Sequence, residues 1–279
     1  MRAPPHPLRP FRPAVFLLVG LAALGLSAAP TATRGDDKDA ADPLAKLAKT
    51  YKLEVVATDP TFPVKTTHGK IEGKAADKKA VAAYTSLLVT EFGLYPTDLV
   101  KRTQLKRIVL CDELAFAGQR RTAIPDYEHD TLYFDVVRGD HDKTYQRKVI
   151  HHEFFHVVDW KDDGLVYEDD RWAALNPKDF KYGTGGKNAQ DKPDTSVLTD
   201  KYPGFLNHYS TTGVEEDKAE VFANMIMEVE YLAKRMKTDK VLVAKVERMK
   251  ELLAKFCPDV DEKWWAKVEK VKRDDGKKK

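Results

Sequence analysis

Three histidines and a glutamate lie within six consecutive residues of an otherwise apolar stretch. The stretch reads KVIHHEFFHVVDW, residues 148–160, and its polar cluster consists of His151, His152, Glu153 and His156. The same turns of a helix would carry two phenylalanines and two valines, so we expect a largely buried helix rather than one that turns its polar residues to solvent. Because burying an imidazole or a carboxylate without a partner is costly, a binding partner must offset that cost.

The spacing within this cluster indicates a metal ion as the partner. His152 and His156 are four residues apart, so on a helix they lie one turn apart and roughly 40° around the axis. Two imidazoles in this position can bind one tetrahedral ion, whereas Glu153 projects off that line and is better placed as a base for a water molecule. This is the H-E-x-x-H pattern of zinc hydrolases, and it predicts one catalytic Zn²⁺. His151 lies outside the pattern, and we expect it at the surface or in a layer behind the ligands.

A catalytic zinc ion also needs a third protein ligand and an open position for water. The candidates lie downstream, in the segment HYSTTGVEEDKAEVFANM, residues 208–225. Four groups compete for this role: His208, Glu215, Glu216 and Asp217. Glu220 is a fifth if the helix enters the site differently.

The two segments together, HEFFHVVDW and NHYSTTGVEEDKAEVFA, resemble the gluzincin clan of zinc peptidases. Within that clan the chain is similar to bacterial zinc-binding metallopeptidases and to the catalytic domain of anthrax lethal factor. In those proteins a tyrosine precedes a helix that bears E-x-x-x-E, and the domain has two lobes in a zincin-like fold. The resemblance implies that Tyr209 lies at the site, that Glu216 binds zinc and that Glu220 supports a ligand histidine.

Helical spacing favours the same third ligand. Glu216 and Glu220 are four residues apart and can share one helix face, whereas the residue four after Glu215 is an alanine without a polar group. Their helix must also bury an apolar stripe, which Glu216 can flank. The stripe consists of Phe222, Met225, Ile226 and Val229. We therefore expect Glu216 as the third ligand and Glu220 behind it.

Two further residues have a functional and a structural interpretation. Tyr209 could donate a hydrogen bond to the oxyanion that develops during peptide hydrolysis, or it could be a packed core tyrosine. Asp159 shares the face of His156 and could hold a histidine ring nitrogen, or it could be a charge at the helix end. We expect Glu153 and Tyr209 to be catalytic and Asp159 to support the ligands.

The run TLYFDVV, residues 131–137, also has two interpretations. In the resembling enzymes an edge strand just before the zinc helix pairs with the substrate backbone. The alternative is an ordinary strand within the sheet.

The N-terminus indicates export. Residues 1–13 contain three arginines and no acid, residues 14–29 are apolar and small, and SAAPTA offers a site for a signal peptidase. At 16 residues the apolar run is short for a membrane span. We expect a signal peptide over residues 1–29, a secreted or periplasmic protein, and no membrane association after the signal is removed.

Charge gives no support to binding of nucleic acid. Removing residues 1–29 removes the three arginines, so the formal net charge falls from +3 to zero. The two cysteines, Cys111 and Cys257, could form a disulfide in an exported protein or remain buried thiols.

The order of the elements predicts an α+β domain. Strand patterns occupy residues 52–58, 105–114 and 130–139, and helical periods follow at residues 77–95, 142–160, 214–232 and 240–256. We expect an N-terminal mixed sheet with helices, the central H-E-x-x-H helix, and a mainly helical C-terminal part. Residues 30–42 are expected to be a flexible lead-in, 43–272 the zincin-like catalytic domain, and 273–279 a disordered basic tail.

The leading hypothesis is therefore an exported zinc-dependent metallopeptidase that acts on a peptide or protein. One alternative is a zinc amidase that acts on cell-wall or modified peptides. Another is a zincin-fold binding protein with little turnover, although a pure binder has no need of Glu153.

Overall fold

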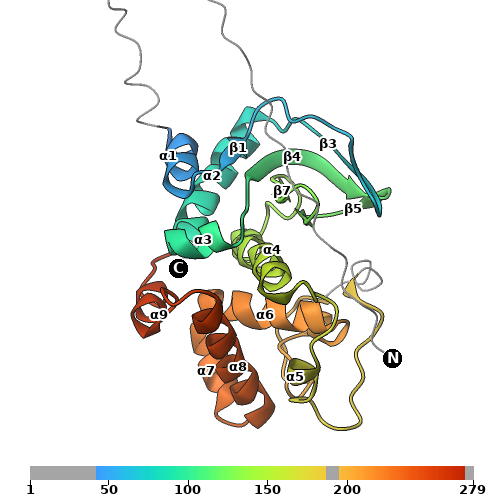
Figure 1. Ribbon diagram of the computed structural model, residues 1–279, viewed down its shortest axis with the longest axis vertical. Coiled ribbons are helices and arrows are strands. Elements are labelled where there is room, and N and C mark those ends of the chain that lie inside the picture. The colour runs from blue at the N-terminus through green and yellow to red at the C-terminus, as the bar shows by residue number, and fades with distance from the viewer. Residues whose placement is uncertain (1–41, 187–194, 274–279) are drawn as a thin grey trace, which may run out of the picture. The chain divides into compact units, whose positions relative to one another are not determined.

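The computed structural model of the chain describes residues 42–186 and 195–273 (Figure 1). The expected signal peptide, nearly all of the expected lead-in and residues 274–279 lie outside this part. Asp42, the last residue of that lead-in, caps the first helix by accepting a hydrogen bond from the amide of Leu44. Among the described residues, no helix is both long enough and apolar enough to span a membrane.

A mixed sheet is built around one long strand. Its strands are β1 (Glu54–Val56), β2 (Val64–Thr66), β3 (Gly69–Lys74), β4 (Arg107–Phe116), β5 (Gln119–Arg120), β6 (Ala123–Asp126) and β7 (Thr131–Asp135). The first half of β4 pairs in parallel with β1 and β7, and its second half pairs antiparallel with β3 and β5. The sheet is thus mixed, as the sequence predicts.

The edge of the sheet near the helix of residues 143–163 is β6, not β7. All five residues of β7 are buried, and the strand pairs with β4 on one side and with β6 on the other. The expectation that residues 131–137 form the substrate-binding edge is therefore wrong, and the ordinary-strand interpretation holds. Pro125 within β6 fits the edge, because proline has no amide hydrogen to donate to a further strand.

Helices surround this sheet and make up the later part of the chain, which confirms the α+β class. They are α1 (Pro43–Tyr51), α2 (Lys78–Phe92), α3 (Thr97–Arg102), α4 (Lys143–Asp163), α5 (Asp170–Ala173), α6 (Val214–Met227), α7 (Val229–Met236), α8 (Lys240–Phe256) and α9 (Glu262–Val268). The helix predicted from residue 214 to 232 is divided at Glu228 into α6 and α7. Figure 1 shows α4 between the sheet and α6.

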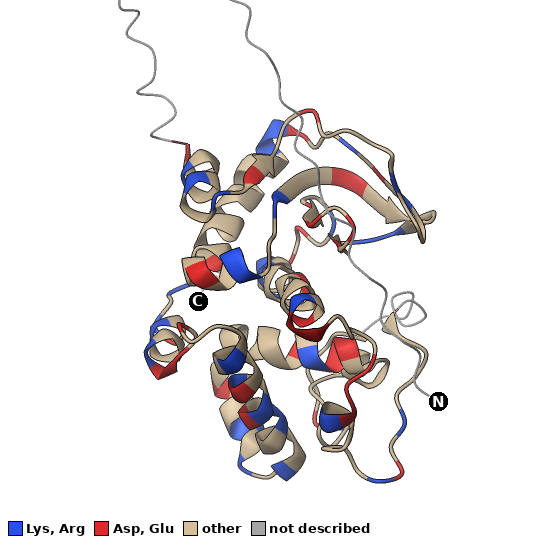
Figure 2. Cartoon of the chain, viewed as in Figure 1, with Lys and Arg blue, Asp and Glu red and all other residues tan. Residues whose placement is uncertain are grey.

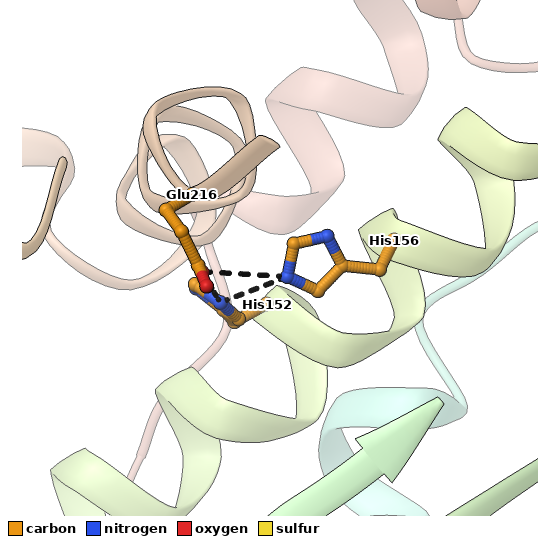
Figure 3. Close-up of side chains that lie close together, drawn as sticks. All are labelled: His152, His156 and Glu216. Carbon is orange, nitrogen blue, oxygen red and sulfur yellow. Dashed lines mark hydrogen bonds and ion pairs between the residues drawn. The ribbon is translucent and has the colours of Figure 1, made fainter. Parts of the chain in front are cut away.

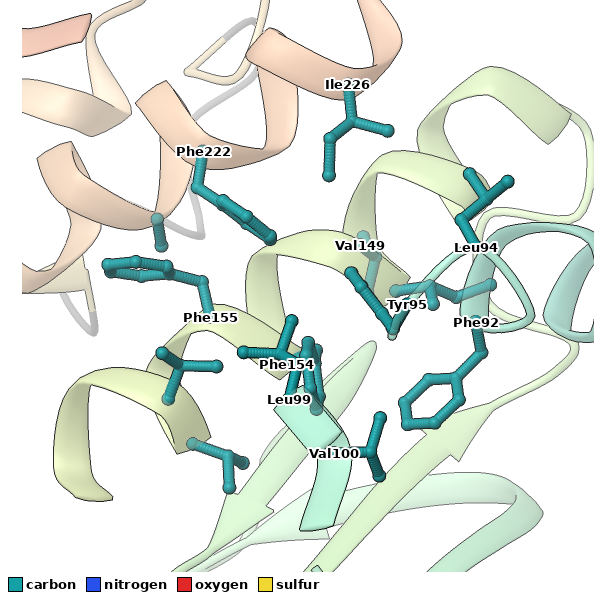
Figure 4. Close-up of a cluster of buried hydrophobic side chains, with 14 of the residues drawn as sticks. Phe92, Leu94, Tyr95, Leu99, Val100, Val149, Phe154, Phe155, Phe222 and Ile226 are labelled. Atoms are coloured by element: carbon teal, nitrogen blue, oxygen red, sulfur yellow. The ribbon is translucent and has the colours of Figure 1, made fainter. Parts of the chain in front are cut away.

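Aromatic side chains fill the space on both sides of α4 (Figure 4). Phe154 stacks on Tyr95 with ring centroids 4.2 Å apart and lies edge-on to Phe92 at 5.1 Å. Phe155, the next residue, points to α6 and packs against Phe222 at 5.2 Å. Burial of each such ring contributes about 1.5–3 kcal/mol, so α4 is fixed between two apolar layers.

A buried polar cluster lies on the α2 side of α4. Glu91, fully buried in α2, accepts hydrogen bonds from Arg147 at 2.6 Å, from His151 Nε2 at 3.0 Å and from Arg273 at 2.8 Å. His151 Nδ1 lies 2.6 Å from the hydroxyl of Tyr95. His151 is therefore a core residue, and the alternative that it lies at the surface is wrong. Arg273, which the sequence assigned to the tail, belongs to this cluster.

The two cysteines do not form a disulfide. Cys111 in β4 and Cys257 after α8 are both free and buried. The buried-thiol interpretation therefore holds.

Candidate metal centre

The helix α4 carries the two histidines of the motif. It begins where the Asp142 side chain accepts a hydrogen bond from the amide of Tyr145 at 3.0 Å. It ends at Gly164, whose φ of 79° favours glycine. The uninterrupted helix between them brings the rings of His152 and His156 together, with centroids 4.8 Å apart.

The helix α6 brings a glutamate to these rings. It starts after Gly213, and Glu216 is its third residue. A Cβ at position 213 would collide with the carboxylate of Glu215, so a larger residue there would have to displace that side chain.

His152, His156 and Glu216 converge, as Figure 3 shows. Glu216 Oε2 lies 3.0 Å from His152 Nε2 and 3.6 Å from His156 Nε2, and the two Nε2 atoms are 3.1 Å apart. The side chains of the two histidines are 8% exposed and that of Glu216 is 12% exposed. Three potential ligand atoms therefore point at one partly open position.

Glu220 fixes the far side of the His152 ring. Its Oε1 lies 3.1 Å from His152 Nδ1, which must donate to a carboxylate, so the Nε2 atom of a neutral ring keeps its lone pair for a ligand. Asn207 donates to Glu220 Oε2 at 2.6 Å, and Lys148 lies 3.4 Å from the same atom. Hydrogen bonds to a ligand histidine of this kind fix its orientation at a metal.

The charges at this site fit a cation. Burial lowers the pKa of His152, but its contacts with Glu216 and Glu220 raise it well above the usual value. Burial raises the pKa of Glu216, but its contacts with the two histidines hold it well below the usual value. The carboxylates of Glu216 and Glu220 thus place negative charge beside the two imidazoles, and a divalent ion would balance that charge. Two imidazole nitrogens and one carboxylate form a known ligand set of catalytic zinc, so the residues present fit this ion.

Tyr209 lies at the same site. It begins the short 3₁₀ helix Tyr209–Thr211, its hydroxyl donates to Glu216 Oε1 at 2.8 Å, and its ring lies 5.9 Å from that of His152. A Cβ at Gly186 would collide with both Glu216 Oε1 and the Tyr209 hydroxyl. The side chain thus faces the site and is not a core tyrosine remote from it.

Glu153 faces a large cavity beside these ligands. The cavity has a volume of about 1040 Å³, and its lining includes the edge strand β6 as well as His152, Glu153, Tyr209 and Glu216. Burial raises the pKa of Glu153, and the nearby histidines oppose that rise. The carboxylate is thus in the cleft, off the line of the ligands, as the helical spacing predicts.

Asp159 does not contact a histidine, so that part of the expected site is wrong. It pairs with Lys218 of α6, whose Nζ lies 2.8 Å from the carboxylate, and both side chains are nearly inaccessible. Burial raises the pKa of Asp159 to about 6 against the opposing charge of Lys218. His156 Nδ1 is buried without a hydrogen-bond partner in the part of the chain that the structure describes.

The other candidates for the third ligand lie elsewhere. His208 packs against the ring of Tyr202 at 5.6 Å, and Asp217 is paired with Lys245 at 2.7 Å. Glu215 lines the cavity but does not join the three converging side chains.

Sequence analysis missed Asn207 and Lys148, which hold Glu220. Their positions in the sequence could have indicated these roles. Asn207 lies two residues before Tyr209, and Lys148 lies one helical turn before His152.

The chain was compared with known protein families, sequences and structures. No protein-family model and no curated protein sequence matches the chain. Its structure is similar to the crystal structure of a putative zinc-binding metallo-peptidase from Bacteroides caccae. The TM-score is 0.49 at 16% sequence identity, over 84% of this chain and 92% of that chain.

Proposed function

We propose that the chain is an exported zinc-dependent peptidase of the gluzincin type. The observation that supports this most strongly is the convergence of His152, His156 and Glu216 beside Glu153 at the wall of a large cavity. In this proposal the three converging residues hold one Zn²⁺. When bound, zinc would lower the pKa of a water molecule from about 15.7 toward about 7 and polarise the scissile carbonyl.

Glu153 is the general base. Its carboxylate takes a proton from the attacking water and returns it to the nitrogen of the leaving amine. Tyr209 donates its hydroxyl hydrogen to the carbonyl oxygen of the substrate as negative charge develops there. This requires the hydroxyl to turn from Glu216 Oε1, its present acceptor, toward the substrate.

The free edge of β6 would bind the substrate backbone. All four of its residues, Ala123–Asp126, line the cavity, and the strand is the last in the described sheet. An extended peptide can add to such an edge through main-chain hydrogen bonds, which supply affinity without demanding a particular sequence. Residues 183–186 and 212–216 line the cavity as well. The substrate would thus lie between two lobes, as in a zincin.

Export is part of the proposal because of the sequence of residues 1–29. N-terminal sequencing of the protein from its native host would test it. A mature N-terminus near Pro30 would support export, and an intact Met1 would contradict it.

The activity is tested with a diverse peptide mixture whose cleavage products are identified by mass. We expect cleavage by the full-length protein, loss of cleavage with a chelator and recovery with added zinc. Glu153→Gln should retain zinc but lose more than about a hundredfold in turnover, because an amide cannot accept the proton of the water. Cleavage that resists the chelator, or near-normal turnover of Glu153→Gln, would contradict the proposal.

A further inference from the structure

The wall of the cavity beyond His156 is aromatic. Trp160 lies one helical turn after His156 on α4, so the two side chains share a face of the helix. The rings of Trp160 and Tyr127 are stacked, with centroids 5.2 Å apart, and both residues line the cavity that Glu153 faces. These two rings form an aromatic shelf. Along the helix axis it begins about 6 Å from His156, at ~1.5 Å per residue, so it lies close to the proposed reaction centre.

The aromatic shelf and its surroundings are exposed although they are apolar. Trp160 is 37% exposed, and Leu165 and Tyr167, which follow the end of α4, are 53% and 72% exposed. These are three of the five large apolar side chains that are exposed within residues 42–186 and 195–273. Tyr167 also lines the cavity. Exposed apolar side chains that gather at a cavity are typical of a binding surface.

Polar contacts hold the aromatic shelf in place. Lys161, which follows Trp160 in α4, lies 2.8 Å from the carboxylate of Asp130. This ion pair joins the end of α4 to the turn between β6 and β7, which carries Tyr127. Within that turn the buried Asp126 accepts hydrogen bonds from the two amides that follow Tyr127, at 3.1 and 3.2 Å. The rings are therefore held before a substrate binds, which lowers the entropic cost of binding.

The aromatic shelf continues from the edge strand proposed to bind the substrate backbone. Tyr127 directly follows Asp126, the last residue of β6, and every residue of β6 lines the same cavity. An extended peptide on that edge would pass the shelf, and successive side chains of the peptide would project to opposite faces. Aromatic rings bind apolar groups, and aromatic ones best, through stacking and exclusion of water.

We propose that the aromatic shelf is a substrate subsite for a large apolar side chain, above all an aromatic one. The inference rests on the proposed function, because it requires a peptide beside the metal centre. The side chain belongs to a residue close to the scissile bond. It packs against Trp160, which Tyr127 holds in place by stacking.

The test measures peptide binding by the full-length Glu153→Gln protein with zinc, using titration calorimetry. The probes are peptides of one length with blocked ends, built from alanine and glycine, with a single phenylalanine placed at each position in turn. Their counterparts carry alanine or lysine at that position. We expect phenylalanine at one position to bind at least about tenfold more tightly than alanine, as for an apolar group that fills a pocket. Lysine at that position should bind no better than alanine.

Adding Trp160→Ala should bring the ratio of the phenylalanine and alanine affinities close to one and leave the zinc content unchanged. Trp160→Gln should have the same effect, so the result does not depend on the folding of one variant. Trp160→Phe keeps a ring and should keep most of the preference. The matched control is Tyr231→Ala, because Tyr231 is a half-buried aromatic residue of α7 that does not line this cavity.

Three results would overturn the inference. They are equal binding of the phenylalanine and alanine probes, a preference for lysine, and a preference for phenylalanine that survives Trp160→Ala and Trp160→Gln. Equal loss of the preference in Tyr231→Ala would also overturn it, because the effect would then not be specific to the shelf.

The peptidase proposal can fail separately. Cleavage by the unaltered protein without any preference for a large apolar side chain would overturn the subsite and leave the peptidase standing. Selective binding of the phenylalanine probes without cleavage by the unaltered protein would support the subsite and overturn the peptidase.

Discussion

His152 is oriented by a carboxylate that is itself held by three donors. Besides its contact with the ring, Glu220 accepts hydrogen bonds from Asn207, Asn224 and Lys148. Burial raises the pKa of Glu220, but the charge of Lys148 and the hydrogen bonds with His152 and Asn207 hold it at about 2. The His152 ring is thus held in place by this hydrogen-bonded carboxylate before any metal ion binds. Support of this kind keeps the geometry of a metal ligand rigid.

The substitution Tyr209→Phe tests the catalytic role of the tyrosine hydroxyl. The substitution removes one hydrogen-bond donor and little volume, so the fold and the zinc content should persist. We expect turnover to fall on the order of a hundredfold, with the Michaelis constant little changed, as for loss of an oxyanion contact. Steady-state kinetics on a cleaved peptide would measure this. An unchanged turnover would assign the hydroxyl to holding Glu216 rather than to catalysis.

Residues related by helical spacing could be predicted, and residues related only by the fold could not. His152, Glu153 and His156 follow from one turn of α4, and Glu216 with Glu220 from one turn of α6. Asp159 shares the face of His156 but pairs with Lys218, 59 residues later in the chain. Nothing local marks that pairing, because it depends on how α6 packs across α4.

At the scale of elements, α4 is fixed by ion pairs as well as by its apolar faces. Lys218 links it to α6 through Asp159, and Arg147 links it to α2 through Glu91. All four side chains are nearly inaccessible to solvent. Each ion pair therefore joins α4 to one neighbouring helix and fixes the rotation of α4 about its own axis. The rotation of α4 decides where its histidines point.

Lys218→Met should be strongly destabilising. It leaves Asp159 buried without its cation, and removing one partner of a buried pair costs about 3–5 kcal/mol. Denaturant unfolding would measure the loss. The control is Lys250→Met, which removes an exposed pair with Glu262 and should cost at most about 1 kcal/mol. Equal effects of the two substitutions would contradict this role of Lys218.

The long amphipathic helices and the buried strands could be predicted from their periods, and the short edge elements could not. The helix α8 spans Lys240–Phe256, as its apolar period predicts. The strand β7 lies within the predicted region 130–139, and β4 overlaps the region 105–114 but continues to Phe116. The strand β6 is only four residues long and contains Pro125, which interrupts its alternation. It pairs with β7 as a hairpin through residues 127–130, and it becomes the edge strand because the other side of β7 pairs with β4.

At the scale of the described chain, charges of both signs are spread over the helices and strands (Figure 2). The more unusual charges are the buried ones. Glu91 joins α2 and α4 to Arg273, which is 182 residues away along the chain. The C-terminal end of the described region is thus held beside the helix that bears the histidines, although the sequence marks it only as basic.

Glu91 should make stability depend on pH in the acid range. Burial raises its pKa, but hydrogen bonds from His151 and Arg273 lower it from 4.5 to about 2. Because the folded pKa is the lower one, this stabilisation is present above pH 4.5 and is lost as the pH falls toward 2. It is on the order of 3 kcal/mol.

The comparison of the unaltered protein with Glu91→Gln isolates this contribution, because glutamine does not titrate. Denaturant unfolding at several pH values should show the unaltered protein losing its advantage between pH 4.5 and 2. A constant difference in the free energy of unfolding across that range would contradict the role of Glu91.

Metal content tests the central claim most directly, because the proposed activity depends on the ligand set. Zinc would be measured by elemental analysis in the full-length protein, in Glu216→Ala and in the neighbouring control Glu215→Ala. We predict one zinc ion per chain in the unaltered protein and in Glu215→Ala, and loss of zinc from Glu216→Ala. Full zinc occupancy in Glu216→Ala, or absence of zinc from the unaltered protein, would contradict the account.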